Sequence, residues 1–132
     1  MIAQYWDETE DVLAKEIVSD WPAFLELVRR TETSSSGRGI PAIELSDDED
    51  VTCIFIRFEG GGCTVATGDS KGLAWPAGFN NGGCEYVHYD YFGSWSEVPA
   101  DLVIPREKAL AAVKSFLETG DIPPSVLLLV RE

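Results

Sequence analysis

The sequence predicts an α+β fold, in which a mostly antiparallel β-sheet carries two α-helices, at about 20–30 and 105–118, packed on one face. Three observations lead to this prediction. Two segments repeat their apolar residues with the period of a helix. The segment 40–98 alternates short apolar runs with turn residues, many of them glycine. No linker or internal repeat is visible, so we expect one domain over residues 1–132.

The amino-terminal quarter predicts two short strands followed by the first helix. The runs IAQYW and VLAKEIV are typical of strands and are separated by an acidic turn. Asp20 can cap the helix that follows. Trp21, Phe24 and Val28 share one apolar face of this helix. The polar run TETSSSGRG then predicts a loop.

The middle of the chain predicts an antiparallel meander over 40–98. The run IPAIEL contains a proline, which favours an edge strand. The run VTCIFIRF is β-branched and aromatic, with apolar residues on both faces, and Ile54, Ile56 and Phe58 share one of them. The turn signals EGGG, GDSKG and NNGG separate it from the runs CTVAT, LAWPAGF and CEYVHYDYF.

Local signals delimit the second helix and a final strand. Pro105 has the φ angle that suits a first helical turn, and Gly120 fits the left-handed position that follows a helix end. Ala109, Val113 and Phe116 lie on one apolar face between them. The run SVLLLV then predicts a buried final strand.

The chain is strongly acidic, with 23 acidic and 10 basic residues and a net charge of −13. Such a chain repels nucleic acid and anionic membranes and attracts basic proteins. The amino terminus lacks the features of a signal peptide, and no apolar run is long enough for a membrane helix. Cys53, Cys63 and Cys84 do not form a disulfide pattern. We therefore expect a cytoplasmic protein.

No constellation of catalytic or metal-binding residues stands out. His88 is the single histidine, and Cys84 and Asp90 near it lack the spacing of a metal site. The run GDSKG matches the G-x-S-x-G nucleophile elbow at Ser70, but that motif needs a strand before it and a helix after it. The run LAWPAGF is not helical in pattern. We predict no enzyme, no cofactor and no metal, with a small serine hydrolase at Ser70 as a remote alternative.

The segment 93–126 carries a recognisable pattern: an aromatic-rich strand leads into it, and a G-x-W-[ST]-E-like step, a helix beginning at proline and an A…FL.TG helix end follow. With this pattern the chain resembles the first-numbered immunity protein family of bacterial polymorphic toxin systems. The opening AQYW is similar to the family's first strand. Relatives often have a tryptophan in the last strand, where this chain has leucines. The matching residues are Gly93, Trp95, Glu97, Pro105, Ala109, Phe116, Leu117, Thr119, Gly120 and Pro123 or Pro124.

The resemblance implies a protein that binds a cognate toxin domain and blocks it. Toxins linked to this family are frequently nucleic-acid deaminases. An inhibitor needs no catalytic apparatus of its own. An acidic inhibitor can also compete for the basic cleft of a toxin that binds nucleic acid.

Candidate contact residues come from two aromatic-rich segments and one acidic run, because interface cores favour aromatic side chains with charged residues at the rim. Packing in the core remains an alternative for Trp75, Phe79 and Trp95. These three could also form an apolar platform for a small molecule or carbohydrate, which is the alternative function. The predicted partner-binding residues are Asp47, Asp48, Asp50, Asp69, Trp75, Phe79, Asp90, Trp95 and Glu97.

Overall fold

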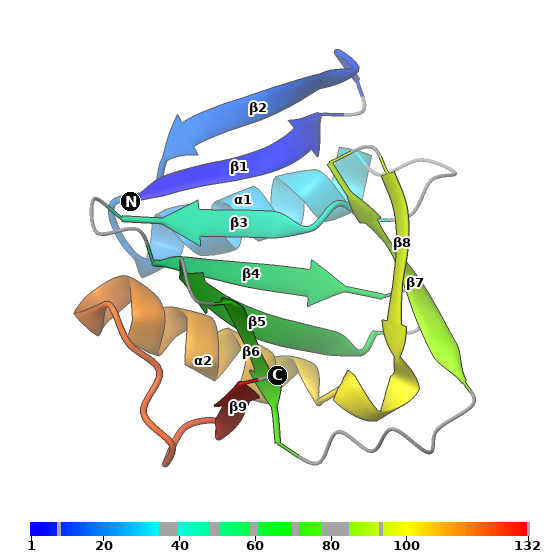
Figure 1. Cartoon of the computed structure of the whole chain (residues 1–132). Coiled ribbons are helices and arrows are strands. Elements are labelled where there is room, and N and C mark those ends of the chain that lie inside the picture. Colours follow the sequence, from blue (N-terminus) through cyan, green and yellow to red (C-terminus); the bar gives the residue numbers. More distant parts are fainter. Residues whose placement is uncertain are drawn as a thin grey trace.

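The computed structural model confirms the α+β fold, with two helices and a mostly antiparallel sheet (Figure 1). It describes residues 1–7, 9–34, 40–47, 51–58, 61–69, 72–77, 85–92 and 94–131, with only the backbone described at Ser34, Asp90, Ser94 and Trp95. The helices are α1 (Trp21–Ser34) and α2 (Arg106–Thr119), with a 3-10 helix at Ala100–Leu102. The strands are β1 (Ile2–Asp7), β2 (Val12–Ile17), β3 (Ile43–Ser46), β4 (Thr52–Arg57), β5 (Cys63–Asp69), β6 (Gly72–Pro76), β7 (Tyr86–Tyr91), β8 (Ser94–Pro99) and β9 (Leu129–Arg131).

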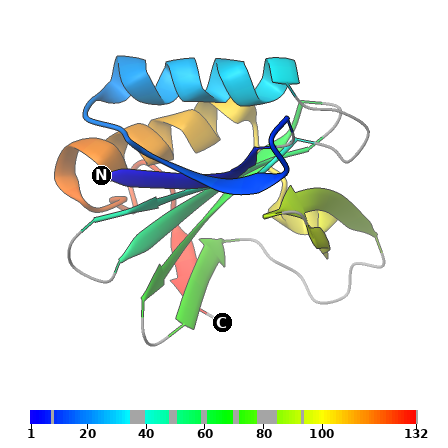
Figure 2. The same ribbon diagram turned by 90° about the horizontal axis from the view of Figure 1, so that it is seen from above.

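The strands form a seven-stranded sheet and a separate hairpin. The sheet has the order β2-β1-β3-β4-β5-β6-β9, and every neighbouring pair in it is antiparallel. β7 and β8 pair only with each other in the described part of the chain. Figure 2 shows α1 and α2 on one side of the sheet and the β7–β8 hairpin on the other. We call the side covered by α1 and α2 the helix face and the opposite side the open face.

Side-chain alternation along β4 accounts for this layering. Phe55 packs on the helix face with Phe24 of α1 and Phe116 of α2. A second apolar cluster on the open face joins Val98 of the hairpin to Ile54, Ile56 and Phe58. A strand that is apolar on both faces must be covered on both, since successive side chains point to opposite sides. The prediction of a strand with apolar residues on both faces is confirmed.

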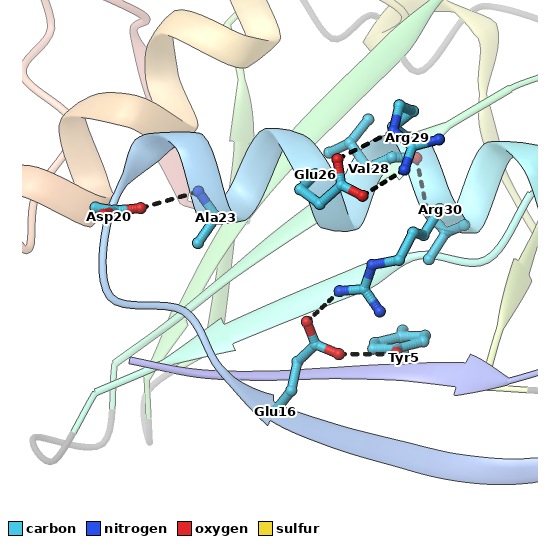
Figure 3. A network of polar contacts seen from close by, with 9 residues as sticks. Tyr5, Glu16, Asp20, Ala23, Glu26, Val28, Arg29 and Arg30 are labelled. Carbon is cyan, nitrogen blue, oxygen red and sulfur yellow. Dashed lines mark hydrogen bonds and ion pairs between the residues drawn. The ribbon is translucent and has the colours of Figure 1, made fainter.

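The local signals at the helix ends are confirmed. The Ala23 N–H donates to Asp20 Oδ1 at 2.9 Å, which caps α1 (Figure 3). Gly120 has φ +79° directly after α2, and its N–H donates to the Phe116 carbonyl at 2.7 Å. That left-handed conformation strains any residue with a Cβ, so glycine suits it. No described helix has the length and hydropathy needed to cross a membrane.

The first helix runs past its predicted end and through the start of the predicted loop. α1 continues to Ser34. Thr31 lies in this last turn, is buried, and accepts a hydrogen bond from Arg57 Nη2 at 2.6 Å. A contact with β4 thus stabilises a turn whose polar composition by itself favours a loop, because tertiary packing overrides weak local propensity.

Three predictions about the sheet are wrong. β3 lies between β1 and β4 and not at an edge, because Pro41 precedes the strand and leaves its backbone donors intact. The meander ends at β6, since β9 occupies the outer edge of β6 and the hairpin pairs separately. The final strand is not buried: in the run SVLLLV, Leu127 is buried, whereas Leu128 and Val130 are exposed at this sheet edge.

Candidate functional site

The described residues hold no cluster of three or more His, Cys, Asp or Glu side chains that could bind a metal. His88 Nε2 lies 3.2 Å from Glu97 Oε2, and both side chains are exposed on the hairpin. Cys53 and Cys63 are buried free thiols. Burial raises the pKa of Cys53 to about 12 and also raises that of Cys63. Since only a thiolate is nucleophilic, both cysteines are inert packing residues near neutral pH.

The segment around Ser70 does not have the context of a nucleophile elbow. Ser70 itself lies outside the described residues. Asp69 at the end of β5 pairs with Gly72 at the start of β6 in antiparallel register, so the segment between them joins two strands. An elbow requires a turn from a strand into a helix. The hydrolase alternative therefore loses its structural basis.

A groove of about 580 Å³ lies between the open face of the sheet and the β7–β8 hairpin. This volume is within the range of sites that bind small molecules or short segments. Strands β3 to β6 supply its floor, and β7 supplies one wall. We call it the sheet–hairpin groove. It is lined by Glu44, Thr52, Ile54, Ile56, Gly68, Asp69, Gly72, Leu73, Trp75, Tyr89 and Tyr91.

Strand alternation explains why these side chains meet. Ile43 and Leu45 of β3 pack in the helix-face core, so Glu44 between them points to the open face. In the same way Tyr89 and Tyr91 of β7 pack against the open-face cluster. A polar residue flanked by two core residues is thereby placed opposite the aromatic wall of the hairpin.

Glu44 and Tyr91 are in direct contact across this groove. The Tyr91 hydroxyl donates to Glu44 Oε2 at 3.1 Å. Burial, followed by the Glu44 charge and this hydrogen bond, raises the pKa of Tyr91 to about 12. The tyrosine therefore remains a protonated donor at neutral pH. Among the described residues, no lysine or arginine forms an ion pair with Glu44.

Two of the predicted partner-binding residues lie in this groove. Asp69 is exposed, and its two carboxylate oxygens each lie 3.4 Å from a guanidinium nitrogen of Arg131 in β9. Trp75 is half-buried and packs against the open-face cluster. Its indole Nε1 is shielded from solvent and donates to no described acceptor. Trp75 thus combines a packing role with a ring at the groove surface.

The other predicted residues are not brought to the groove by the described structure. Asp47 is half-buried just after β3, and Glu97 is exposed on the hairpin beside His88. The Asp90 backbone pairs with that of Trp95 across the hairpin. Asp48, Asp50 and Phe79 lie outside the described residues, as do the side chains of Asp90 and Trp95.

A second hollow, of about 420 Å³, lies beside Trp6 between β1 and the last turns of α1. Its neighbourhood contains charges of both signs that pair with one another. Figure 3 shows Glu16 between the Tyr5 hydroxyl, which donates to it at 3.0 Å, and the Arg30 guanidinium. Arg29 likewise pairs with Glu26. Because Arg29 and Arg30 in its lining already pair with acidic side chains of the chain, this hollow is a weaker candidate for a partner site than the groove.

Exposed apolar side chains extend the open face toward the β2 edge. Ile2, Leu13 and Ile17 are 45%, 43% and 77% exposed. Ile2 and Ile17 are paired in register, and their neighbour Ala3 packs on the helix face. Ile2 and Ile17 therefore lie on the same side of the sheet as Glu44. The pair Gln4–Lys15 separates Ile2 and Ile17 from Leu13 on this face. Exposed apolar side chains rimmed by polar ones often mark a site of protein interaction.

Two charged residues with a role in the folded structure, Glu44 and Arg57, are not among the residues predicted from the sequence. Glu44 is the one acid inside IPAIEL, between two apolar residues, and this alternation is a signal for the open face. Arg57 is the last but one residue of the run VTCIFIRF and lies two positions after Phe55, so both point to the same face of the strand; it is 2% exposed. Its position predicts the helix face, but no local pattern shows that the side chain is buried there.

In a comparison with protein families, residues 2–129 match the model described as Immunity protein Imm1. The matched region begins in β1 and ends in β9, so it includes both helices, the sheet and the hairpin. No curated protein matches the sequence. Family membership indicates a role in immunity to a toxin, and proteins of such families are generally not enzymes. The match covers nearly the whole chain and agrees with the pattern in its carboxy-terminal third, so the chain belongs to the Imm1 immunity protein family.

Proposed function

We propose that this chain is a single-domain, cytoplasmic immunity protein that binds and neutralises a cognate bacterial polymorphic toxin domain. The toxin presents a basic surface and acts on nucleic acid, as a deaminase does. Inhibition requires binding alone, without a catalytic group, cofactor or metal in this chain. The Imm1 match over residues 2–129 supports the toxin as partner.

The open face is the surface that best supports this function. It carries the sheet–hairpin groove, whose walls are aromatic and whose floor contains the Glu44 carboxylate. Exposed Ile2, Leu13 and Ile17 continue the same face. Aromatic anchors beside apolar surface and a few charges are the composition of a protein interface core. This combination is the observation that carries the proposal.

The charge of the chain supports a basic partner. A net charge of −13 accelerates association with a positively charged surface and disfavours nucleic acid as a ligand. We propose that the acidic run contributes to this steering, with the remaining residues in direct contact. The proposed partner-binding set is Asp47, Asp48, Asp50, Asp69, Trp75, Phe79, Asp90, Trp95 and Glu97.

The decisive experiment combines binding and protection. The toxin domain encoded beside this protein's own gene is produced, its affinity for the chain is measured over a range of salt concentrations, and growth is scored with both expressed. Tight binding that weakens with salt and restores growth is expected. Absence of both binding and rescue would refute the proposal.

Charge reversal of Asp47, Asp48 and Asp50 tests the steering component. The variant is expected to associate more slowly than the parent at low salt and to dissociate at a similar rate, because long-range charge acts mainly on encounter. Stopped-flow measurement at two salt concentrations separates the two rates. Equal association rates for variant and parent would remove the run from the interface.

A small-molecule or carbohydrate ligand is a second candidate function, favoured by the aromatic lining and volume of the groove. A ligand of that kind would bind with little dependence on salt. A fragment screen in which the Trp75 indole signal is monitored distinguishes the two functions. Saturable binding of an uncharged fragment would favour the small-molecule function, because the immunity function predicts no such binding.

A further inference from the structure

Glu44 is a half-buried anion in the floor of the sheet–hairpin groove, and it lacks a countercharge among the described residues. Its one described side-chain partner is the neutral Tyr91 hydroxyl, which donates to Oε2. A carboxylate offers about four acceptor positions, so most of its hydrogen-bonding capacity remains open. Partial desolvation of an uncompensated charge costs free energy, and a cation that entered the groove would recover it.

The chain's described cations are engaged elsewhere or lie outside the groove. Arg131 pairs with Asp69 at one end of the groove lining. Arg57 and Arg106 both contact Glu32 on the helix face. None of the described lysines or arginines lines the groove. The missing positive charge is therefore expected from a partner.

The groove walls favour an arginine as that cation. Tyr89 and Tyr91 contact each other edge to face with ring centroids 6.3 Å apart, and Trp75 lines the same groove. A guanidinium is planar and weakly hydrated, stacks on aromatic faces, and can bind a carboxylate with two parallel hydrogen bonds. An ammonium gives only a compact, strongly hydrated charge, so it gains less from these rings.

We propose that the sheet–hairpin groove receives an arginine side chain of the cognate toxin, with Glu44 as its ion-pair partner and the rings of Tyr89, Tyr91 and Trp75 around it. This proposal rests on the proposed function, because the toxin supplies the arginine. Beyond the proposed function, it assigns specificity for the cognate toxin to Glu44. Steering charges act at long range, whereas Glu44 acts in the bound complex.

The main test is Glu44→Gln, with Glu118→Gln as its matched control. Glutamine keeps the shape and an acceptor for the Tyr91 hydroxyl but removes the charge. Glu118 is exposed on α2, on the opposite side of the sheet, and its replacement changes the net charge equally. We expect E44Q to weaken toxin binding by about 30-fold or more, mainly through faster dissociation, since one partner of a buried charge pair is lost. E118Q is expected to bind within about twofold of the parent.

A double-mutant cycle then identifies the arginine. Each toxin arginine is replaced by alanine, and its effect is measured with the parent and with E44Q. One arginine is expected to lose most of its effect in the E44Q background, because contacting residues are energetically coupled. If E44Q behaves like E118Q, or if the coupled residue is a lysine or no basic residue at all, the proposal is overturned.

Melting temperatures of all variants separate binding losses from misfolding, and Glu44→Asp serves as a second, charge-preserving variant with a displaced carboxylate.

A toxin-free measurement distinguishes failure of this proposal from failure of the immunity function. The parent is titrated with N-acetyl-arginine amide while the Trp75 indole resonance is followed by NMR, and Trp75→Phe assigns that resonance. A saturable shift that is absent in E44Q supports the groove as an arginine site even if the tested toxin does not bind. If neither N-acetyl-arginine amide nor N-acetyl-lysine amide shifts the Trp75 resonance of the parent, the proposal that the groove binds arginine is overturned.

Discussion

Each face of the sheet holds a charged side chain from one of two neighbouring strands, and the two charges are compensated differently: Arg57 is buried, whereas Glu44 is half-buried. On the helix face, Arg57 donates to the carbonyls of Val28 and Pro41, both at 3.0 Å, and to Thr31 Oγ1. Its Nη1 also lies 3.4 Å from Glu32 Oε1. On the open face, Glu44 receives one described side-chain hydrogen bond, from a neutral hydroxyl.

This difference separates a structural charge from a charge available to a partner. Burial lowers the pKa of the Arg57 guanidinium to about 10, although the Glu32 carboxylate opposes the shift. Arg106 of α2 also binds Glu32, at 2.6 Å, so the network joins α1, β4 and α2. Arg57 thus has several partners, although its Nε is buried and donates to no described acceptor. A charge held by several partners fixes how elements pack, whereas a charge with one neutral partner is a site where a ligand can gain free energy.

Removal of the helix-face charge should have the largest effect on folding. Arg57→Met removes the guanidinium donor from the Pro41 carbonyl and leaves Glu32 with one cation fewer. The Val28 carbonyl loses one of two side-chain donors, since the Thr31 hydroxyl also donates to it at 3.0 Å. We expect the free energy of unfolding to fall by about 3–5 kcal/mol, as for other broken buried pairs. Chemical denaturation measures this. Arg29→Met, at an exposed pair with Glu26, is the control and should leave stability nearly unchanged.

Glu32→Gln should weaken the same network and change its response to acid. Burial pushes the pKa of Glu32 upward, but the hydrogen bond and charge of Arg106, with the charge of Arg57, hold it below the ordinary value of 4.5. Because the folded-state pKa is the lower one, the stabilisation is complete above about pH 4.5 and is lost as the pH falls through the folded value. E32Q should lose about 1.5–3 kcal/mol at neutral pH and show a flatter stability profile below pH 4.5. A profile parallel to that of the parent would exclude Glu32 from the acid response.

Trp75→Ala should lower both the stability of the fold and the affinity for the toxin, because Trp75 is half-buried and also lines the groove. We expect a stability loss of about 1–2 kcal/mol, below that of a fully buried tryptophan. Toxin affinity should fall by about tenfold, or about 1.4 kcal/mol. Trp75→Phe keeps an aromatic ring and should recover most of the stability. Unchanged affinity in the stable phenylalanine and alanine variants would assign Trp75 to packing alone.

The smallest expected effect is a change in the pKa of Tyr91 when Glu44 is neutralised. In the parent, this pKa is raised to about 12 by burial first and by the Glu44 charge second. The charge contribution disappears in E44Q, so the pKa should move toward the ordinary value of 10.0. Tyr91 stabilises the folded state below about pH 10 and loses that contribution as the pH rises toward 12, so E44Q should show a shallower loss. NMR titration of the Tyr91 ring measures the pKa directly. An unchanged value would show that Glu44 places no charge beside the hydroxyl.

The local features of the fold follow from the sequence with little help from long-range contacts. Asp20 and Gly120 delimit the helices through backbone hydrogen bonds within a few residues of themselves. The alternation in VTCIFIRF predicts a strand covered on both faces, because two apolar faces cannot both meet water. The family resemblance can also be recognised in the sequence, because its motifs are contiguous in the chain and do not depend on long-range contacts.

The tertiary structure alone decided which strands are neighbours and which charges are shared. A period-2 pattern predicts a strand but not its partner, so β3 as an interior strand and the separate hairpin could not be derived from their residues. The candidate site depends on the same choices: Glu44 and Tyr91 are 47 positions apart and meet because the hairpin packs on the open face. Arg57 likewise meets its partners through the helix-face packing of α1. Local propensity acts over a few residues, whereas compensation of a buried charge depends on every element that surrounds it.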